Sequence, residues 1–396
     1  FGGTSVRSSE TRKNAVEHVK LAVEDGFKVV VVVSAMGRKG DPYATDTLLS
    51  LVNDKEAKVS PREIDLLMSC GETISSVVFS QELNEAGLRA AALTGDQAGF
   101  LTNDEFNEAK ILKMETDRIL EELKQHDAIV VAGFQGKTEK GDITTIGRGG
   151  SDTSAAALGA ALKAKYIDIF TDVEGIMTAD PRIVDNAKPL SVVTYNEICN
   201  LAHEGAKVIH PRAVELAMQA EVPMRIRSTY SKEEGTLITA SRSDEKGKDI
   251  PDRLITGIAH MAGITQIHLD ANEDPNLSAK VFQTMAEANI SVDFINISQK
   301  GVTYTVQSSQ ADKAVNLLKQ LGLTPTIEEH CAKVSTVGAG MSGVPGVTAK
   351  IVQTLSSRGI QILQSADSHT TIWVLIKEKD LQEAVIALHD IFELHR

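Results

Sequence analysis

The chain has 396 residues, of which 42% are hydrophobic and 24% are charged, and this length exceeds what one core usually supports, so two or three domains are expected. The net charge of −13 argues against nucleic acid as a partner, because binding phosphates requires clustered Lys and Arg. No apolar run approaches the roughly 18 residues of a transmembrane helix, and no signal peptide is visible, so a cytoplasmic location is expected.

Helical and strand patterns alternate over the first 240 residues. The predicted elements are a helix with Val16, Val19 and Val23 on its apolar face, strands over 28–33, 129–133 and 166–170, and a helix over 107–125. Strands separated by helices indicate a largely parallel sheet that is covered on both faces. Ligands of such sheets gather at the carboxyl ends of the strands, where several polar loops of this chain fall.

The stretch from Thr145 to Asp152 is the most informative of these loops. Its sequence is Thr-Ile-Gly-Arg-Gly-Gly-Ser-Asp, and an alanine-rich helical pattern follows it. Glycines let the backbone approach a ligand closely, a helix start favours anions, and Arg148 can hold a carboxylate or phosphate through two parallel hydrogen bonds. The stretch therefore predicts a site for a small charged metabolite beside a phosphate.

The last third of the chain contains an internal repeat that follows a polar, charged segment. Residues 279–284 (Ala-Lys-Val-Phe-Gln-Thr) match residues 349–354 (Ala-Lys-Ile-Val-Gln-Thr), and the offset is 349 − 279 = 70 residues. Each copy predicts a helix followed by two strands, the second of them over 302–306 and 372–376. A flanking strand and helix would complete a βαββαβ unit in each copy.

Three common nucleotide-binding signatures are excluded. A G-x-G-x-x-G motif starting at Gly147 would need glycine where the chain has Asp152. A P-loop ending in Gly136-Lys-Thr would need glycine at Val131. The H-R-D and D-F-G motifs of protein kinases are also absent from the sequence. Any phosphoryl-transfer site must therefore be of another kind.

Six short motifs occur in an order that is typical of one family. They are Phe1–Val6 (Phe-Gly-Gly-Thr-Ser-Val), Val33–Gly37, Ser69–Glu72 (Ser-Cys-Gly-Glu), Gly147–Asp152, Thr171–Gly175 and Thr178–Arg182. Together they resemble aspartokinase, of the amino-acid kinase family, and the repeat resembles the paired ACT domains that follow the catalytic domain in that enzyme. Within the family, the details look most similar to the diaminopimelate-sensitive aspartokinase of Bacillus-type bacteria.

This resemblance covers essentially the whole chain and implies a fold. We expect an α/β protein with a carbamate kinase-like, three-layer αβα domain around a mostly parallel sheet, followed by two ferredoxin-like ACT units. The implied boundaries are 1–240 for the catalytic domain, 241–253 for a linker, 254–328 for the first ACT unit and 329–396 for the second. A strand at 254–260 is available to complete the second unit.

The implied reaction is ATP + L-aspartate → ADP + 4-phospho-L-aspartate, assisted by Mg²⁺. It is the first step of the aspartate pathway to lysine and diaminopimelate, threonine, methionine and isoleucine. The substrate carboxylate is ionised at neutral pH and needs no general base, so positioning and charge stabilisation should supply the catalysis. The family also has a catalytic lysine directly before the Phe-Gly-Gly motif, and this sequence begins at that Phe.

Site residues are transferred from the family position by position. The implied catalytic residues are Asp152, Arg148 and Gly3. The implied aspartate site contains Ser34, Thr45, Glu72, Arg148, Gly149, Gly150 and Ser151, with Arg148 on the α-carboxylate and Glu72 accepting from the α-ammonium group. The implied ATP site contains Phe1, Gly2, Gly3, Thr4, Ser5, Thr171, Asp172, Met177, Arg182 and Lys207. No metal site formed by protein ligands is expected.

Regulation is expected in the repeat. The resemblance implies an allosteric amino acid (meso-diaminopimelate, lysine or threonine) bound where ACT units pair, between the chains of a homo-oligomer, with no membrane involved. The implied regulatory residues are Asp274, Asp293, Asn296, Met341, Ser342, Val344 and Gly346. Pairing would also cover the exposed sheet edge of each unit.

Several alternatives remain open on the sequence alone. Arg148 and Glu72 can form a structural ion pair, and the repeat can serve only for oligomerisation. The chain can be another kinase of the same fold, acting on glutamate, N-acetylglutamate or a nucleotide, or a non-catalytic amino-acid sensor. His210 is expected to start a helix rather than to catalyse, and His203, His389 and His395 form no cluster and are expected at the surface.

Overall fold

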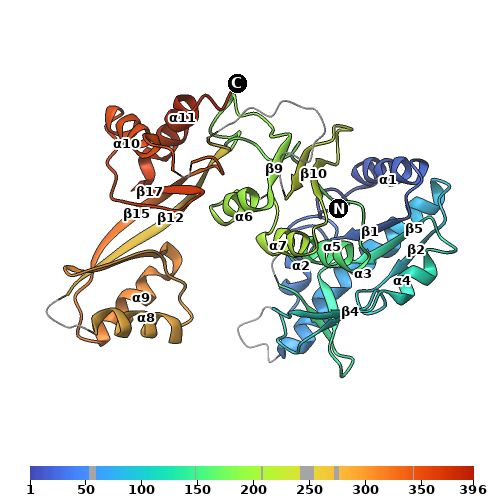
Figure 1. Ribbon diagram of the computed structural model, residues 1–396. Coiled ribbons are helices and arrows are strands. Elements are labelled where there is room, and N and C mark those ends of the chain that lie inside the picture. The colour runs from blue at the N-terminus through green and yellow to red at the C-terminus, as the bar shows by residue number, and fades with distance from the viewer. Residues whose placement is uncertain (53–58, 148, 207, 241–253, 272–275, 342) are drawn as a thin grey trace. The chain divides into compact units, whose positions relative to one another are not determined.

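The computed structural model describes residues 1–396 apart from 53–58, 148, 207, 241–253, 272–275 and 342 (Figure 1). The chain divides into two compact units. Unit 1 comprises Phe1–Ile176, Pro189–Ala202 and Lys207–Ile250, and unit 2 comprises Met177–Lys188, His203–Ala206 and Pro251–Arg396. Unit 2 thus includes two short segments from within the first 240 residues, and the expected boundaries at 240, 254 and 328 remain a prediction. No helix in the described part of the chain is long and apolar enough to cross a membrane.

Unit 1 is built around a parallel sheet with the strand order β1-β5-β2. The strands are β1 (Val29–Val33), β5 (Ala128–Ala132) and β2 (Ala90–Leu93), and every residue of β5 is buried. One face is covered by α1 (Ser9–Glu24) and α3 (Pro61–Glu85), and the other by α4 (Asp117–Glu122) and α5 (Gly150–Ala161). The burial of the strands on both faces accounts for their continuous apolar runs. The expected three-layer αβα arrangement is confirmed.

A second sheet of unit 1 has the order β8-β10-β11-β9. Its outer pairs are parallel and its central pair, β10 with β11, is antiparallel. The strands are β8 (Ile167–Thr171), β9 (Val192–Thr194), β10 (Met224–Ser228) and β11 (Thr236–Thr239), and further helices are α2 (Thr45–Ser50), α6 (Tyr195–His203) and α7 (Pro211–Gln219). Pro211 at the first position of α7 makes His210 its N-cap residue, so His210 starts a helix as expected.

A small third sheet corrects one prediction. Its order is β4-β3-β6-β7, and its strands are β3 (Phe100–Thr102), β4 (Ile111–Met114), β6 (Gln135–Lys137) and β7 (Ile143–Thr145). The helix predicted over 107–125 is therefore wrong in its first half, because Ile111 to Met114 form a strand antiparallel to β3. A short apolar run fits both periods, and pairing with a strand that is distant in sequence decides between them.

Unit 2 contains one six-stranded antiparallel sheet with the order β13-β14-β12-β15-β17-β16. Its strands are β12 (Gly257–Asp270), β13 (Asp293–Ser298), β14 (Gly301–Gln307), β15 (Thr326–Val337), β16 (Gln364–Asp367) and β17 (Thr371–Lys377). Its helices are α8 (Leu277–Glu287), α9 (Ser308–Gln320), α10 (Val347–Ser357) and α11 (Leu381–Ile391), with a 3-10 turn at Glu378–Asp380.

The two long central strands of this sheet serve both copies of the repeat (Figure 1). The first half of β12 pairs with the second half of β15, from Gly257 with Val337 to Met261 with Lys333, and after a bulge the second half of β12 pairs with the start of β15. One hydrophobic core lies beneath α8 and α9 and another beneath α10 and α11. Each copy of the repeat therefore has its own core on a shared sheet.

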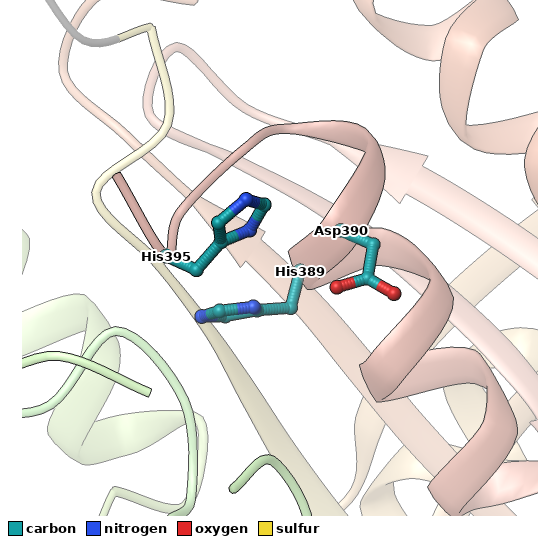
Figure 2. Close-up of side chains that lie close together, drawn as sticks. All are labelled: His389, Asp390 and His395. Atoms are coloured by element: carbon teal, nitrogen blue, oxygen red, sulfur yellow. The ribbon is translucent and has the colours of Figure 1, made fainter. Parts of the chain in front are cut away.

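The histidines near the C-terminus correct a second prediction. His203 is exposed, but the side chains of His389, Asp390 and His395 lie together, with possible ligand atoms within 4.8 Å of one another (Figure 2). His389 is fully buried, and its Nε2 lies 2.9 Å from the Thr178 hydroxyl. Burial lowers the pKa of His389, which favours the neutral ring. Local sequence patterns do not reveal this environment, because Thr178 is 211 residues away.

Candidate active site

A cleft of about 570 Å³ opens in unit 1 at the carboxyl ends of β1 and β5. Its walls are the N-terminal loop, the turn that follows β1, α2, one face of α3, the segment before β4 and the N-terminus of α5. The lining residues are Gly3, Ser34, Ala35, Gly37, Thr45, Leu49, Ile64, Met68, Glu72, Asn107, Glu108, Phe134, Gly147, Gly149, Gly150, Ser151 and Asp152. This is the rim at which parallel sheets bind ligands.

Most of the substrate-side residues inferred from the sequence meet in this cleft. The lining contains the expected Gly3, Ser34, Thr45, Glu72, Gly149, Gly150, Ser151 and Asp152. They come from five separate stretches of sequence, so their convergence is a property of the fold. Arg148, the residue expected on the substrate α-carboxylate, lies outside the described residues.

Glu72 projects from α3 as a buried carboxylate. One oxygen, Oε1, accepts a hydrogen bond of 3.1 Å from the backbone N–H of Ala35. The other oxygen, Oε2, is buried and has no hydrogen-bond partner among the described residues. Burial raises the pKa of Glu72 to about 7, although the Ala35 N–H opposes this shift. A buried oxygen without a partner at a cleft wall is suited to a ligand that brings its own donor.

The start of α5 shows why the glycines of the Gly147–Asp152 loop are needed. Gly149 is the N-cap residue of α5, with φ of 68°, and a Cβ there would lie 2.2 Å from the ring of His210. A Cβ on Gly150 would lie 2.5 Å from the ring of Phe134. Two rings therefore pack against bare backbone at the N-terminus of α5, where backbone N–H groups and the helix dipole favour an anion.

Asp152 lies in the first turn of α5, and its Oδ2 accepts from the backbone N–H of His210 at 3.3 Å. Burial raises its pKa, while this hydrogen bond acts in the opposite direction. The contact ties the N-terminus of α7 to that of α5. Asp152 thus reaches the cleft from a backbone that is held at the starts of both helices.

The N-terminal segment runs beside the end of β1. The N–H of Ser34 donates to the Phe1 carbonyl at 3.1 Å, and the N–H of Gly37 donates to the Gly3 carbonyl at 2.9 Å. A Cβ on Gly3 would lie 2.6 Å from the Gly37 carbonyl oxygen, so only glycine fits. Ser5 is fully buried, with its hydroxyl 2.6 Å from that of Thr229. Phe1 and Gly3 therefore lie directly against the turn that follows β1.

The remaining residues inferred for ATP are distributed as follows. Thr171 ends β8, and its hydroxyl donates to Asp172, which forms an exposed ion pair with Arg38 at 3.0 Å. Met177 and Arg182 belong to unit 2, where Arg182 pairs with Asp180. Lys207 lies outside the described residues.

Some lining residues were not predicted from the sequence. Met68 lies one turn before Glu72 on α3, and Phe134 follows β5 in a left-handed conformation, with φ of 67°. Asn107 and Glu108 were hidden because the segment 107–125 was assigned to a helix. Asn107 has a positive φ of 70°, which asparagine adopts more readily than most residues and which does not occur within a helix. The asparagine was therefore the one sign in the sequence against a helix at this position.

The charged side chains among the described lining residues of the cleft are all acidic. Glu72, Glu108 and Asp152 contribute carboxylates, and none of the lining residues that the structure describes is Lys or Arg. An anionic ligand in this cleft therefore depends on the α5 N-terminus and on cations outside the described lining residues.

The regulatory residues inferred from the repeat lie in unit 2. Asp293 and Asn296 are exposed on the edge strand β13, Met341 is buried, Val344 is exposed, and Gly346 is the N-cap residue of α10. Asp274 and Ser342 lie outside the described residues. The Asp293 carboxylate already accepts from Lys333 at 2.6 Å, so an effector ammonium group at Asp293 would have to share or displace this contact.

Comparison with known proteins assigns both parts of the chain. Residues 1–228 match the Amino acid kinase family, and residues 271–321 and 326–390 each match an ACT domain. "Aspartokinase 1" of Bacillus subtilis (strain 168) is 62% identical over the whole of this chain and 98% of its own length. "Aspartokinase" of Geobacillus stearothermophilus is 40% identical, over 100% of this chain and 96% of its own length.

Solved structures give the same assignment. The chain is similar to E. coli aspartokinase III in complex with aspartate and ADP (R-state), with a TM-score of 0.79, 27% identity, and coverage of 99% of this chain and 98% of that chain. It is also similar to E. coli aspartokinase III in complex with lysine and aspartate (T-state), with a TM-score of 0.76, 27% identity and coverage of 98% of both chains. The chain therefore belongs to the aspartokinases, within the amino acid kinase family.

Proposed function

We propose that the cleft of unit 1 binds L-aspartate, and that the chain transfers the γ-phosphoryl group of ATP to its side-chain carboxylate, giving ADP and 4-phospho-L-aspartate. The observation that carries this proposal is the buried Oε2 of Glu72, which has no hydrogen-bond partner among the described residues and lies at the wall of a cleft of about 570 Å³. A carboxylate so placed is satisfied by an ammonium group. Relatives that share the whole length of the chain are aspartokinases, which supports this reaction.

The substrate would be held at both ends. Glu72 accepts from the α-ammonium group, and Arg148 pairs with the α-carboxylate through two parallel hydrogen bonds. Ser34, Thr45 and Ser151 supply hydroxyl groups between these ends. The side-chain carboxylate would then point toward Gly3, where the N-terminal loop and the helix start of α5 meet the cleft.

The nucleotide would lie beside the N-terminal loop. Within the loop Gly2 to Ser5, the N–H groups of Gly3 and Thr4 are suited to the phosphates, because those of Gly2 and Ser5 donate to the carbonyls of Phe170 and Gly2 at 3.4 and 3.0 Å. Thr171 and Asp172 are the proposed contacts to the rest of ATP in unit 1, and Met177, Arg182 and Lys207 remain predictions from the family resemblance. Mg²⁺ would enter bound to the phosphates, as is usual where one or two carboxylates complete its ligands. Asp152 is a carboxylate of the cleft that fits this need.

The chemistry requires positioning more than proton transfer. The attacking carboxylate is already ionised at neutral pH, so no general base has to act. The barrier lies in bringing two anions together, and Arg148, the N-terminal dipole of α5 and the metal ion would offset their repulsion. Asp152, which accepts a hydrogen bond from the His210 N–H, would hold these positively charged groups in position.

Regulation would occur in unit 2. β13 is an edge strand with Ile295 and Ile297 exposed, so pairing with a second unit would cover both its backbone edge and its apolar side chains. An amino-acid effector would bind where two such units meet, in a homo-oligomer. Isothermal titration calorimetry with lysine, threonine and meso-diaminopimelate tests this, and no binding by any of the three would remove it.

A coupled assay of ADP release tests the proposed reaction. The full-length protein should release ADP with L-aspartate and not with L-glutamate or N-acetyl-L-glutamate. Arg148→Ala should lower kcat/KM for aspartate by a factor of 100 or more, about 3 kcal/mol of transition-state stabilisation. Activity on glutamate alone would contradict the assignment of aspartate as the substrate. No phosphotransfer to any of the three would favour a non-catalytic amino-acid sensor.

A further inference from the structure

Asp65 is a fully buried carboxylate that the proposed reaction does not use. It lies on α3 seven residues before Glu72, and Met68 lies between them, so the three side chains project from one face of the helix. Glu72 and Met68 line the cleft, whereas Asp65 lies just behind its wall. A buried acid next to a substrate site therefore has a role other than contact with the substrate.

The carboxylate of Asp65 accepts from donors on two other segments. The N–H of Asn107 lies 3.1 Å from Oδ1 and 3.0 Å from Oδ2. The N–H of Thr145 donates to Oδ2 at 2.9 Å, and the Thr145 hydroxyl donates to Oδ1 at 2.6 Å. One side chain of α3 therefore holds two backbone segments that are 38 residues apart in sequence (145 − 107 = 38).

Both segments lead directly into the cleft wall. Asn107 and the next residue, Glu108, line the cleft themselves. Thr145 is the last residue of β7, two residues before Gly147, where the loop containing Arg148 begins. The N–H of Ala109 also donates to the Thr145 carbonyl at 2.9 Å, so the two held segments are joined to each other. Asp65 thus connects the Gly147–Asp152 loop to the helix that carries Glu72.

The environment of Asp65 is not one that stabilises a buried charge. Its described hydrogen-bond partners are all neutral, and none is a lysine or arginine. Burial raises its pKa, and the hydrogen bonds from Thr145 and Asn107 only partly offset this. A buried carboxylate that has no cation beside it among the described residues costs stability. A binding site can require such a cost, whereas a hydrophobic core does not.

We propose that Asp65 is a positioning residue, which fixes the distance between Glu72 and the start of the Gly147–Asp152 loop on the opposite side of the aspartate site. This inference rests on the proposed function of the cleft. Glu72 is rigidly connected to Asp65 through α3, and the Gly147–Asp152 loop is connected to Asp65 through Thr145. An amino acid held at both its ammonium and its carboxylate is sensitive to this distance, because a misplacement of about 1 Å already weakens catalysis strongly.

Substitution at either end of this contact tests the proposal. Asp65→Asn keeps the shape but replaces one oxygen by an NH₂ group, which then faces an N–H or O–H donor whichever oxygen is lost. Thr145→Val removes only the hydroxyl donor, and Thr145→Ser restores it. The matched control is Glu63→Gln. Glu63 is an exposed carboxylate on the same helix, and it pairs with Arg62.

The readout is the separation of two Michaelis constants. Asp65→Asn and Thr145→Val should raise KM for aspartate about tenfold or more while KM for ATP stays within about twofold, and Thr145→Ser and Glu63→Gln should stay near the parent values. Should Asp65→Asn fail to fold, Thr145→Val still decides. Equal changes in both Michaelis constants, or an unchanged KM for aspartate in folded Thr145→Val, would overturn the positioning role.

Glu72→Gln, measured in the same series, separates this inference from the assignment of the cleft. A higher KM for aspartate in Glu72→Gln but not in the Asp65 and Thr145 variants removes the positioning role and leaves the site intact. An unchanged KM for aspartate in Glu72→Gln removes the aspartate site itself.

Discussion

At the scale of single residues, the two oxygens of Glu72 have different roles. Oε1 is fixed by the Ala35 N–H, and Oε2 is left without a partner among the described residues. This arrangement orients the carboxylate before a ligand arrives, and burial places its pKa at about 7. The substrate ammonium group would favour the ionised form and lower this pKa in the complex.

The first prediction concerns pH. Because the pKa of Glu72 is raised in the free protein, the carboxylate becomes protonated as the pH falls through about 7 and loses the negative charge that would pair with the substrate ammonium group. We expect kcat/KM for aspartate to fall about tenfold per pH unit below that pH, while kcat at saturating aspartate stays flatter. A profile of both constants between pH 5.5 and 8.5, at roughly half-unit steps, would show it; parallel profiles would contradict this role.

Removing the charge from Glu72 gives the second prediction. Glu72→Gln retains the size of the side chain but replaces a charge-assisted hydrogen bond, worth about 1.5–3 kcal/mol. KM for aspartate should rise by a factor of about 10 to 150, the acid limb of the profile should disappear, and KM for ATP should change little. Glu82→Gln, on the same helix and paired with Arg12, is the control. An equal loss in the control would indicate a general effect on α3.

At the scale of elements, the site depends on loops that approach one another backbone to backbone. Gly3 lies against the turn after β1, and Gly149 and Gly150 lie against two aromatic rings. Such contacts have no room for a Cβ, so glycine is required by packing as well as by any ligand. The glycine-rich motifs were therefore informative in the sequence because each one marks a close approach.

Neighbouring glycines of the N-terminal loop provide the third prediction. A Cβ on Gly3 would lie 2.6 and 2.8 Å from the carbonyl oxygens of Gly37 and Ala35, whereas a Cβ on Gly2 would have its nearest contact at 3.9 Å. Gly3→Ala should therefore destabilise the protein by about 1–3 kcal/mol, and Gly2→Ala should leave its stability nearly unchanged. Urea unfolding of both variants compares them directly. Equal stabilities would show that the loop can move away at no cost.

The elements also show how far the sequence alone predicts this fold and this site. The buried strands β1, β5 and β8 were predicted closely, since continuous apolar runs between helical patterns are typical of parallel strands buried on both faces. The residues 111–114 were assigned to a helix, because their strand exists only by pairing with β3. Asn107 and Glu108 were not predicted as site residues, because they fall in the segment 107–125 that the sequence predicts as a helix. Asp65 could not be assigned a role, because its partners are 42 and 80 residues away in sequence.

At the scale of the whole molecule, unit 2 includes a segment from the middle of the chain. Glu204, from His203–Ala206, is buried and pairs with Lys333 of β15 at 2.9 Å, and it also accepts from the Ser335 hydroxyl at 2.6 Å. Lys333 in turn pairs with Asp293. Burial alone would lower the pKa of Lys333, but the two carboxylates outweigh it, and the net pKa is raised. The lysine therefore stays charged.

The fourth prediction tests this buried pair. Lys333→Met leaves the Glu204 carboxylate buried without a cation, which should cost about 3–5 kcal/mol of stability. The double variant Lys333→Met with Glu204→Gln should recover part of the loss, and the exposed Lys319→Met is the control. Chemical denaturation followed by circular dichroism measures all three. A loss below about 1 kcal/mol would indicate that water reaches Glu204 and replaces the lysine.

The measurement that most directly tests the central claim is the steady-state kinetics of phosphotransfer to L-aspartate by the parent chain and by Glu72→Gln. We predict ADP release with aspartate and not with glutamate, and a KM for aspartate that rises at least about tenfold in the variant while KM for ATP is retained. Phosphotransfer to glutamate in place of aspartate, or an unchanged KM for aspartate in the variant, would contradict the assignment of the cleft around Glu72.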